Sequence, residues 1–382
     1  MEMEELFEIN DHKQEEEKQS QQRLLYVDGL NFIRNFFLNM NFWDLDSANE
    51  NIKRFIEAAN NTGYEVEVFI DAGIQSEELL KRWIERREDI VKTCVMDCPT
   101  CITAFVGEMF RNLNIKIHYT VVDKSDTLAC FANHYGADIL SASTDFVRYR
   151  GLKYKIYRQF EIDKTTNKLI LTERKPFKHK QHPKFILKKL PTTLQQYPLL
   201  KEVFEEKKYY RGSPTNLTKY TGNLHGLLKP LRQVFYRIMN VNFEVYEIYP
   251  YWDLRNDQPA WVKEFVKPAD ENLLNQFSPL FKNITFIIDY FINDLVRPRV
   301  IGKEDDLSWN NHLFGFCALI SELVAEVNGT NIIPYMKQCE QYLLKKDIIK
   351  SYGFVEKSKN LHNIQVEIRQ LQSQVDLQKK II

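Results

Sequence analysis

Three apolar runs that end at aspartates organise the first half of the chain. Apolar residues fill positions 24–27 without alternation and stop at Asp28. A second run reaches Asp71, and a third passes through a short loop to Asp145. Uninterrupted apolar runs that end at turns are typical of parallel strands covered on both faces. We therefore predict strands near 24–28, 65–71, 115–122 and 138–142.

Helical stretches separate these strands, and this alternation predicts an α/β fold with a mainly parallel central sheet flanked by helices. Positions 154–162 and 169–173 are expected to extend the sheet as a hairpin. From residue 216 onward, apolar residues recur at three- and four-residue steps, so the C-terminal half is expected to be mostly helical. The last segment, 356–382, shows about two heptads of a coiled-coil seam. It is expected to form a short helix that either contacts a protein partner or packs back on the body.

Carboxylates are concentrated where the predicted strands end. In open α/β sheets, ligands bind at the carboxyl edge, and this edge is where Asp28, Asp71 and Asp145 are expected. Carboxylates a few ångströms apart raise one another's pKa unless a cation lies among them. Oxygen ligands favour Mg or Mn, so the pattern predicts a divalent-ion site. The alternative for Asp28 is that it caps a helix predicted over 32–40.

The order of these blocks resembles a known family. VDGLN at 27–31, FIDAG at 69–73 and DKSDTLACFANHYGADILSASTDF at 123–146 are similar to the PIN-like nuclease core of the flap-endonuclease (XPG) superfamily. Within it, the chain most resembles the asteroid-type branch, over roughly 23–175 and again at LHGLLKPLRQVFY, 224–236. The resemblance implies a metal-dependent endonuclease acting on single-stranded or branched DNA or RNA, with Mg or Mn as cofactor. The metal ligands it implies are Asp28, Asp71, Asp126 and Asp145, with Asp123 as a substitute.

Arg82 occupies a Lys-Arg context similar to that of the basic residue that meets the scissile phosphate in this superfamily. The resemblance therefore implies a phosphate clamp at this position. The alternative is a solvated helix on which Glu and Arg side chains pair at three- and four-residue spacing.

Two positions depart from the family pattern. Lys124 stands where the superfamily has an acid, and Ser143 replaces another aspartate. These changes leave two functions open: a nuclease with a weakened second metal site, or a catalytically degenerate scaffold that binds RNA, DNA or protein. If the Lys124 side chain points inward, its ammonium can take the place of a metal ion. If it points to solvent, Asp123 or Asp126 can supply the ligand instead.

Formal net charge is zero, with 52 basic and 52 acidic residues, which excludes bulk attraction to nucleic acid and leaves only local patches. One such patch is 174–189, with seven Lys or Arg, no acid, and phenylalanines interleaved. Basic side chains neutralise phosphates, and exposed rings stack on bases. The alternative is a solvated linker. The expected nucleic-acid contacts are Lys175, Lys178, Lys180, Lys184, Lys188 and Lys189.

We expect five parts along the chain. They are a disordered acidic tail at 1–22, a PIN-like domain at 23–175, a basic connecting segment at 176–215, a helical domain at 216–355 and the short helix at 356–382. The tail is assigned as disordered because it carries eight acids and two lysines among few apolar residues.

Six cysteines occur without a secretory signal. This predicts a reducing, intracellular compartment, either nuclear or cytoplasmic, and no apolar run is long enough for a membrane span. The spacing of Cys94, Cys98 and Cys101 allows a three-thiolate metal site with His118 or Cys130 as fourth ligand. The alternative is that these cysteines are core residues.

Overall fold

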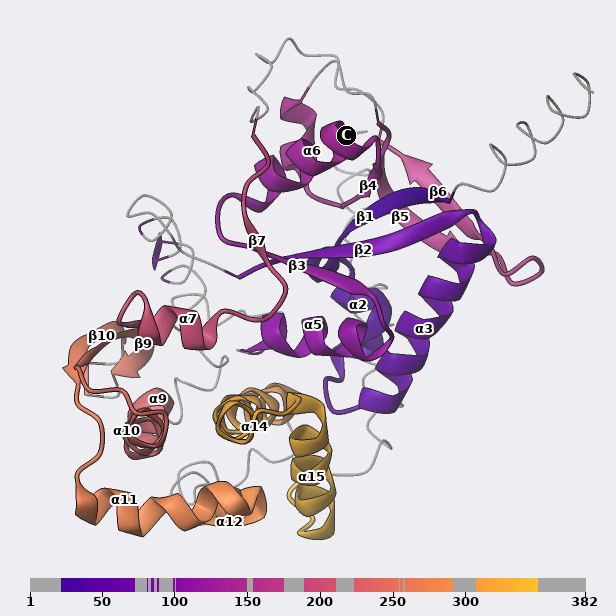
Figure 1. Cartoon of the computed structure of the whole chain (residues 1–382). Helices are drawn as coiled ribbons and strands as arrows, with labels where there is room; N and C mark the ends of the chain where they lie inside the picture. Colours follow the sequence, from indigo (N-terminus) through magenta and orange to yellow (C-terminus); the bar gives the residue numbers. More distant parts are fainter. Residues whose placement is uncertain are drawn as a thin grey trace, which may run out of the picture. The chain divides into compact units, whose positions relative to one another are not determined.

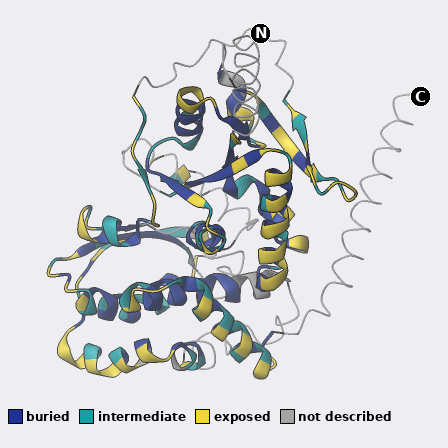
Figure 2. Ribbon diagram, turned by 45° about the vertical axis from the view of Figure 1, so that its right-hand side comes forward, coloured by how far each residue is buried: buried dark blue, intermediate teal, exposed yellow. Residues whose placement is uncertain are grey.

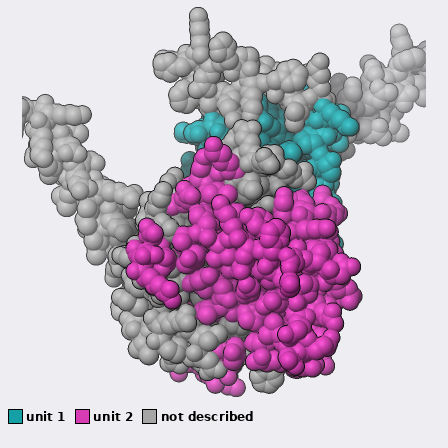
Figure 3. Space-filling model, turned by 90° about the vertical axis from the view of Figure 1, so that its left-hand side faces the viewer, with its two compact units in different colours: residues 1–32, 50–79, 110–197 teal, residues 33–49, 80–109, 198–382 magenta. Residues whose placement is uncertain are grey.

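The computed structural model divides the chain into two compact units (Figure 1; Figure 3). Unit 1 comprises Met1–Phe32, Glu50–Leu79 and Phe110–Tyr197, and unit 2 comprises Ile33–Asn49, Leu80–Met109 and Pro198–Ile382. The structure describes residues 22–72, 81, 84–85, 88, 99, 101–149, 154–174, 189–210, 223–253, 255–256, 258–290 and 307–349.

Unit 1 is built on a seven-stranded sheet with the order β6-β5-β4-β1-β2-β3-β7. The five inner strands are parallel, and β6 and β7 are antiparallel to their neighbours at the two edges. This confirms the predicted α/β fold with a mainly parallel sheet. The strand bounds are β1 Arg23–Asp28, β2 Tyr64–Asp71, β3 Lys116–Thr120, β4 Asp138–Leu140, β5 Ile156–Ile162, β6 Leu169–Glu173 and β7 Thr193–Leu194.

The order of the parallel strands locates the place where a ligand would bind. From β1 the chain moves outward to β2 and β3, and then returns to add β4 and β5 on the other side of β1. The strand order therefore reverses between β1 and β4. In doubly wound sheets, the crevice at the carboxyl ends of these two strands is the usual ligand site.

Helices cover the sheet by burying apolar stripes. Helix α6, Lys124–Tyr135, packs Leu128 and Phe131 against Tyr26 and Phe69 of the sheet. Helix α3, Leu45–Asn61, contributes Phe55, whose ring centroid lies 4.7 Å from that of Phe160 in β5. Figure 2 shows buried and exposed residues along α3, as expected of a helix with one apolar side.

The prediction of one continuous helix over 32–40 is wrong. Three short pieces replace it: η1 Gly29–Phe32, α2 Ile33–Phe36 and η2 Leu38–Met40. Phe36 and Phe37 are both buried. Neighbouring residues of one helix do not face the same side, so a break in the helix lets both rings enter the core.

Unit 2 is mostly helical, as predicted, but it also holds a three-stranded sheet that the sequence analysis missed. Its strands are β8 Lys208–Tyr210, β9 Val245–Asp253 and β10 Gln258–Val266, in the order β10-β9-β8. Among the helices that the structure describes, none is long and apolar enough to cross a membrane. Besides α2 and η2, the described helices of unit 2 are α5 Ile102–Asn112, shared with unit 1, then α7 Leu199–Phe204, α9 Leu224–Leu227, α10 Lys229–Ile238, α11 Glu271–Phe277, η4 Ser278–Lys282, α12 Ile284–Asp289, α14 Leu307–Asn328 and α15 Ile332–Lys345.

Candidate functional site

Asp28 ends the central strand β1 at the point where the strand order reverses. Its side chain has no exposed surface. The following residue has to be glycine, because a Cβ on Gly29 would lie 2.7 Å from Cγ1 of Val68 in the neighbouring strand. The chain can therefore turn into η1 directly after Asp28, which leaves this carboxylate at the carboxyl edge of the sheet.

The carboxylate of Asp28 contacts the ammonium group of a lysine. Lys124, the first residue of α6, places Nζ 2.8 Å from Oδ1 of Asp28. Only 16% of the Lys124 side chain is exposed. Burial by itself lowers the pKa of Lys124, but the carboxylates of Asp28, Asp71 and Asp123 raise it, and the net pKa lies above the usual 10.5. An ammonium thus stands among three of the aspartates predicted to hold a metal ion.

The second oxygen of Asp28 is held by the loop after β4. Ser141 donates its hydroxyl to Oδ2 of Asp28 over 3.0 Å, and the same hydroxyl lies 3.4 Å from Oδ1 of Asn31. The Ser143 N–H donates to Ser141 Oγ at 3.2 Å, which fixes the hydroxyl in place. Both carboxylate oxygens of Asp28 therefore have close partners from within unit 1.

The other predicted ligands on α6 make local bonds. Asp123 caps the helix by accepting the Asp126 N–H at 3.0 Å. Asp126 in turn accepts a hydrogen bond from the hydroxyl of Tyr149. Both acids therefore have a part in holding α6 and the loop that follows β4.

Asp145 and Asp71 complete the predicted set. Asp145 lies in η3, Thr144–Arg148, where its N–H donates to Ser143 Oγ at 3.2 Å and its carboxylate is 3.5 Å from the Ser125 hydroxyl. Asp71 ends β2 with an exposed side chain, close enough to Lys124 to raise its pKa. The structure thus links Asp28, Asp71 and Asp123 through one lysine.

These residues do not fit a divalent ion in this arrangement. Within the described ranges, no three His, Cys, Asp or Glu side chains are grouped closely enough to hold a metal ion. A metal ion at Asp28 would have to displace the Lys124 ammonium, which already contacts the carboxylate. The assignment of Asp28, Asp71, Asp126, Asp145 and Asp123 as metal ligands therefore stays a prediction.

Several predicted contact residues lie outside the described residues, namely Arg82, Lys175, Lys178, Lys180, Lys184 and Lys188. Lys189 is described. Its side chain is exposed, and its carbonyl oxygen accepts a hydrogen bond from the Cys130 thiol at 3.7 Å. The last residue of the basic run is therefore attached to α6.

The sequence analysis missed Arg174, which begins the same run. Its guanidinium donates to the carbonyl oxygens of Ala142, at 2.9 Å, and Ser141, at 3.4 Å. Burial and, to a lesser extent, the neighbouring Arg158 lower the pKa of Arg174 below its usual value. Arg174 therefore adds a second cation to the loop that holds Asp28. Its position at the head of a basic run was the available signal in the sequence.

The cysteine motif is only partly described, because Cys94 and Cys98 lie outside the described residues. Cys101 is buried and donates to Oε2 of Glu322 at 3.3 Å within unit 2. His118 contacts Glu67 and Thr193. These contacts agree with the core-residue alternative for Cys101.

The chain matches no family model and no curated protein. The solved structures that align with it include the bacteriophage T5 flap endonuclease, as a pseudo-enzyme in a product complex with DNA and metal ions, and a T5 protein co-crystallised with metal ions. In each case 12% of the residues are identical, and the alignment covers 84% of this chain and 98% of the other. The TM-scores are 0.21 and 0.20. Similarity at this level does not establish a shared fold, so the description of unit 1 depends on its own strand order.

Proposed function

We propose that the chain is a PIN-like, asteroid-type protein that binds single-stranded or branched nucleic acid without cutting it by a metal-dependent route. The observation that carries this proposal is the contact of 2.8 Å between the Lys124 ammonium and Asp28. It favours the degenerate scaffold over the nuclease, because the ammonium supplies the positive charge that the aspartates would otherwise take from a metal ion.

Electrostatics explains why the lysine and a metal ion compete. Two unit charges 4 Å apart interact by roughly 4 kcal/mol at an effective dielectric constant of 20, so a divalent ion beside the ammonium would be repelled by about twice that energy. The ion would also need several oxygen ligands, while Ser141 and Lys124 already contact both oxygens of Asp28. Metal would therefore bind only if Lys124 moved out.

Nucleic acid is the proposed partner because basic residues gather in one part of the chain. Arg174 lies against the loop that holds Asp28, and it begins the run of seven Lys or Arg at 174–189. Such a run neutralises phosphates. In this proposal the run provides affinity for the nucleic-acid backbone. The segment 356–382, which is expected to form a short helix, lies outside the described residues and remains a candidate contact for a protein partner.

A direct test uses the full chain with a panel of flap, hairpin and single-stranded DNA and RNA, in the presence of Mg or Mn. We expect binding by fluorescence anisotropy and no cleavage above the level of Asp28→Asn. Cleavage that Asp28→Asn abolishes would overturn the proposal and establish the nuclease. Absence of binding to every substrate would overturn it as well.

The role of the basic run is tested by its salt dependence. Replacing Lys178, Lys180, Lys188 and Lys189 by Ala should weaken binding. The slope of log affinity against log salt should fall by roughly 0.7–0.9 for each phosphate that a lysine no longer neutralises. An unchanged slope would leave the run as a linker.

A further inference from the structure

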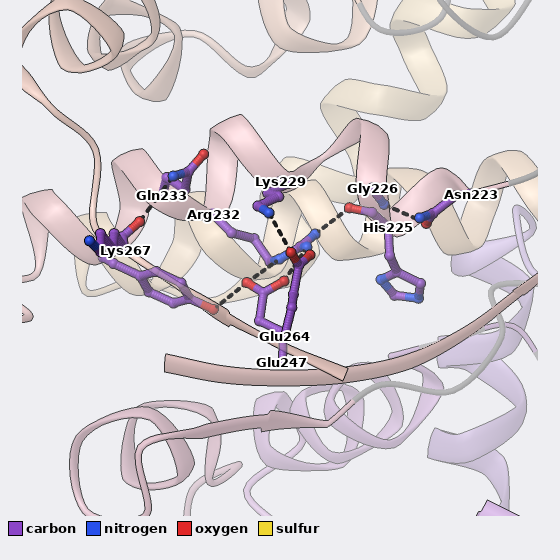
Figure 4. Close-up of polar contacts among 10 residues, drawn as sticks. Asn223, His225, Gly226, Lys229, Arg232, Gln233, Glu247, Glu264 and Lys267 are labelled. Carbon is purple, nitrogen blue, oxygen red and sulfur yellow. Dashed lines mark hydrogen bonds and ion pairs between the residues drawn. The ribbon is translucent and has the colours of Figure 1, made fainter. Parts of the chain in front are cut away.

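The sheet of unit 2 separates its charges between its two faces. Glu247 of β9 and Glu264 of β10 are directly opposite each other, and both are paired with residues of α10. Arg232 binds Glu247, and Lys229 binds Glu264 at 2.6 Å (Figure 4). The acids of the two long strands therefore lie on the face that α10 covers.

Residues one position away along each strand point to the opposite face. On that face Lys208, Tyr246 and Phe265 form a row across β8, β9 and β10. Lys263 precedes Phe265 by two residues, so it lies on the same face, and its side chain is exposed. This face carries lysines and aromatic rings, while the glutamates of the same strands are turned away from it.

Phe265 is the most prominent feature of this face. Its side chain is 66% exposed, the largest value among the exposed large hydrophobic residues of the described chain. Its ring centroid lies 5.0 Å from that of Tyr246, with an angle of 42° between the planes. The Tyr246 ring therefore packs beside the Phe265 ring at a tilt, while most of Phe265 stays exposed.

Two further lysines lie at the rim. Lys207 is exposed, and its Nζ lies 5.0 Å above the ring of Phe243. Lys267 is exposed and contacts Glu244 at 3.5 Å. Because Glu244 is matched by Lys267, Lys263 on this face and Lys207 next to it at the start of β8 add positive charge.

We infer that this face, which we call the aromatic face and define by Lys208, Tyr246, Lys263 and Phe265, binds single-stranded nucleic acid, with Lys207 next to it at the start of β8. A base would stack on the Phe265 ring, and the flanking lysines would contact phosphates. Stacking suits an unpaired base, because a paired base in a duplex is already stacked on both sides. The aromatic face would add a second contact, in unit 2, to the nucleic-acid binding proposed above for unit 1.

The experiment measures binding of the full chain to fluorescent single-stranded oligonucleotides, poly-dT and poly-U, by anisotropy. Phe265→Ala should raise the Kd by roughly 5- to 150-fold, since base stacking on an aromatic side chain is worth about 1–3 kcal/mol. Phe265→Trp should keep the affinity, because it keeps a ring at this position. Tyr135→Ala is the matched control, since Tyr135 is an aromatic residue of unit 1 that is 54% exposed.

Charge is tested separately at the rim. Changing both Lys207 and Lys263 to Ala should reduce the salt slope by roughly 0.7 for each phosphate of the single strand that is no longer neutralised. Lys53→Ala, on the exposed side of α3, is the matched control and should leave the slope unchanged.

The outcomes separate this inference from the proposed function. If Phe265→Ala binds as tightly as the wild type while the Lys178, Lys180, Lys188 and Lys189 variant loses affinity, the aromatic face is excluded and the proposed function stands. If the Phe265 variant alone loses affinity, the inference stands and the basic run is excluded. A wild type that binds neither oligonucleotide would overturn the inference, and binding to the flap and hairpin substrates would then decide the proposed function.

Discussion

Nζ of Lys124 lies 2.8 Å from Oδ1 of Asp28, and Asp28 is fully buried. One charge comes from the start of a helix and the other from the end of the central strand. Removing one partner of such a pair leaves an uncompensated charge in the interior, and this loss typically costs about 3–5 kcal/mol. The pair should therefore contribute to stability, and in the proposed function it also competes with a metal ion.

Lys124→Met should lower the free energy of unfolding by roughly 3 kcal/mol, because the Asp28 carboxylate loses its counter-charge. Adding Asp28→Asn should recover part of this loss. Denaturant unfolding of the single and double variants measures the coupling. Lys53→Met serves as control, since Lys53 forms only a surface pair with Glu57 at 4.0 Å and should contribute less than about 1 kcal/mol. Equal effects of the two lysine variants would contradict the structural role of Lys124.

Placing acidic residues at positions 124 and 143, where the chain departs from the family pattern, should create affinity for metal ions. We expect Lys124→Glu combined with Ser143→Asp to bind Mn, as measured by calorimetry, and to gain thermal stability when Mn is added. The wild type should show neither effect. Asp28→Asn in the double variant should abolish the gain. Mn binding by the wild type as tight as that of the double variant would contradict competition by Lys124.

The interior of unit 2 contains a second buried ion pair. Arg232 of α10 donates Nε and a terminal amino group to the two oxygens of Glu247, at 2.9 and 2.5 Å, and the other amino group to the His225 carbonyl at 2.6 Å (Figure 4). The hydroxyl of Tyr236 also donates to Glu247, at 2.9 Å. Burial opposes the charged form of Arg232, but Glu247 outweighs it and raises the arginine pKa further.

Arg232→Met should therefore destabilise the protein by about 3–5 kcal/mol, because it leaves the Glu247 carboxylate buried without its counter-charge. Arg237→Met is a matched control on the same helix. Arg237 pairs with Glu271 at the surface, at 2.7 Å, and its loss should cost less than about 1 kcal/mol. Thermal or denaturant unfolding checks the difference, and a similar cost for the two variants would show that Arg232 does not hold α10 on β9.

Glu67 should make the stability of unit 1 depend on pH. Burial raises its pKa, but hydrogen bonds from His118 and Lys116, at 2.7 and 2.8 Å, lower it below the usual 4.5. A carboxylate with a lowered pKa stabilises the fold above its unfolded-state pKa, and this contribution is lost as the pH falls through the folded-state value. Glu67→Gln should therefore be less stable than the wild type at pH 7, and the difference should shrink as the pH falls below 4.5.

Thermal unfolding of both proteins between pH 7 and pH 3 gives the comparison. Glu65→Gln is the control, because Glu65 is on the same strand with an exposed side chain. A difference between Glu67→Gln and wild type that stays constant across this range would show that the ionisation of Glu67 is not the cause.

Local sequence determined the architecture of unit 1. Apolar runs that end at Asp28 and Asp71 gave strands with bounds close to those predicted, because burial on both faces favours apolar residues. The buried Glu67 in β2 is the exception, and its charge is paired with Lys116 and His118. The hairpin strand at 169–173 was predicted with its observed bounds. Strand and helix alternation then led to the mainly parallel sheet, since parallel neighbours need a crossover between them.

The β9–β10 hairpin was not predicted, because its local sequence pattern argues against a central strand. Pro250 lies inside β9, the middle strand of its sheet, and proline within a strand pattern argues against a central strand. The tertiary structure resolves the conflict, because the described pairing with β8 reaches only Ile248. Beyond that point, among the described strands, β9 pairs with β10 alone, and proline is tolerated on such an edge.

The sequence identified Lys124 as a departure from the family pattern but left the direction of its side chain open. Only the tertiary structure brings Lys124 to Asp28, 96 residues earlier in the chain, and Arg232 to Glu247 across the interface of a helix and a strand. The periods of helices and strands are local and can be seen in a sequence. The partner of a buried charge depends on which elements pack together, so the packing of α6 on the sheet decided that a lysine stands among the aspartates.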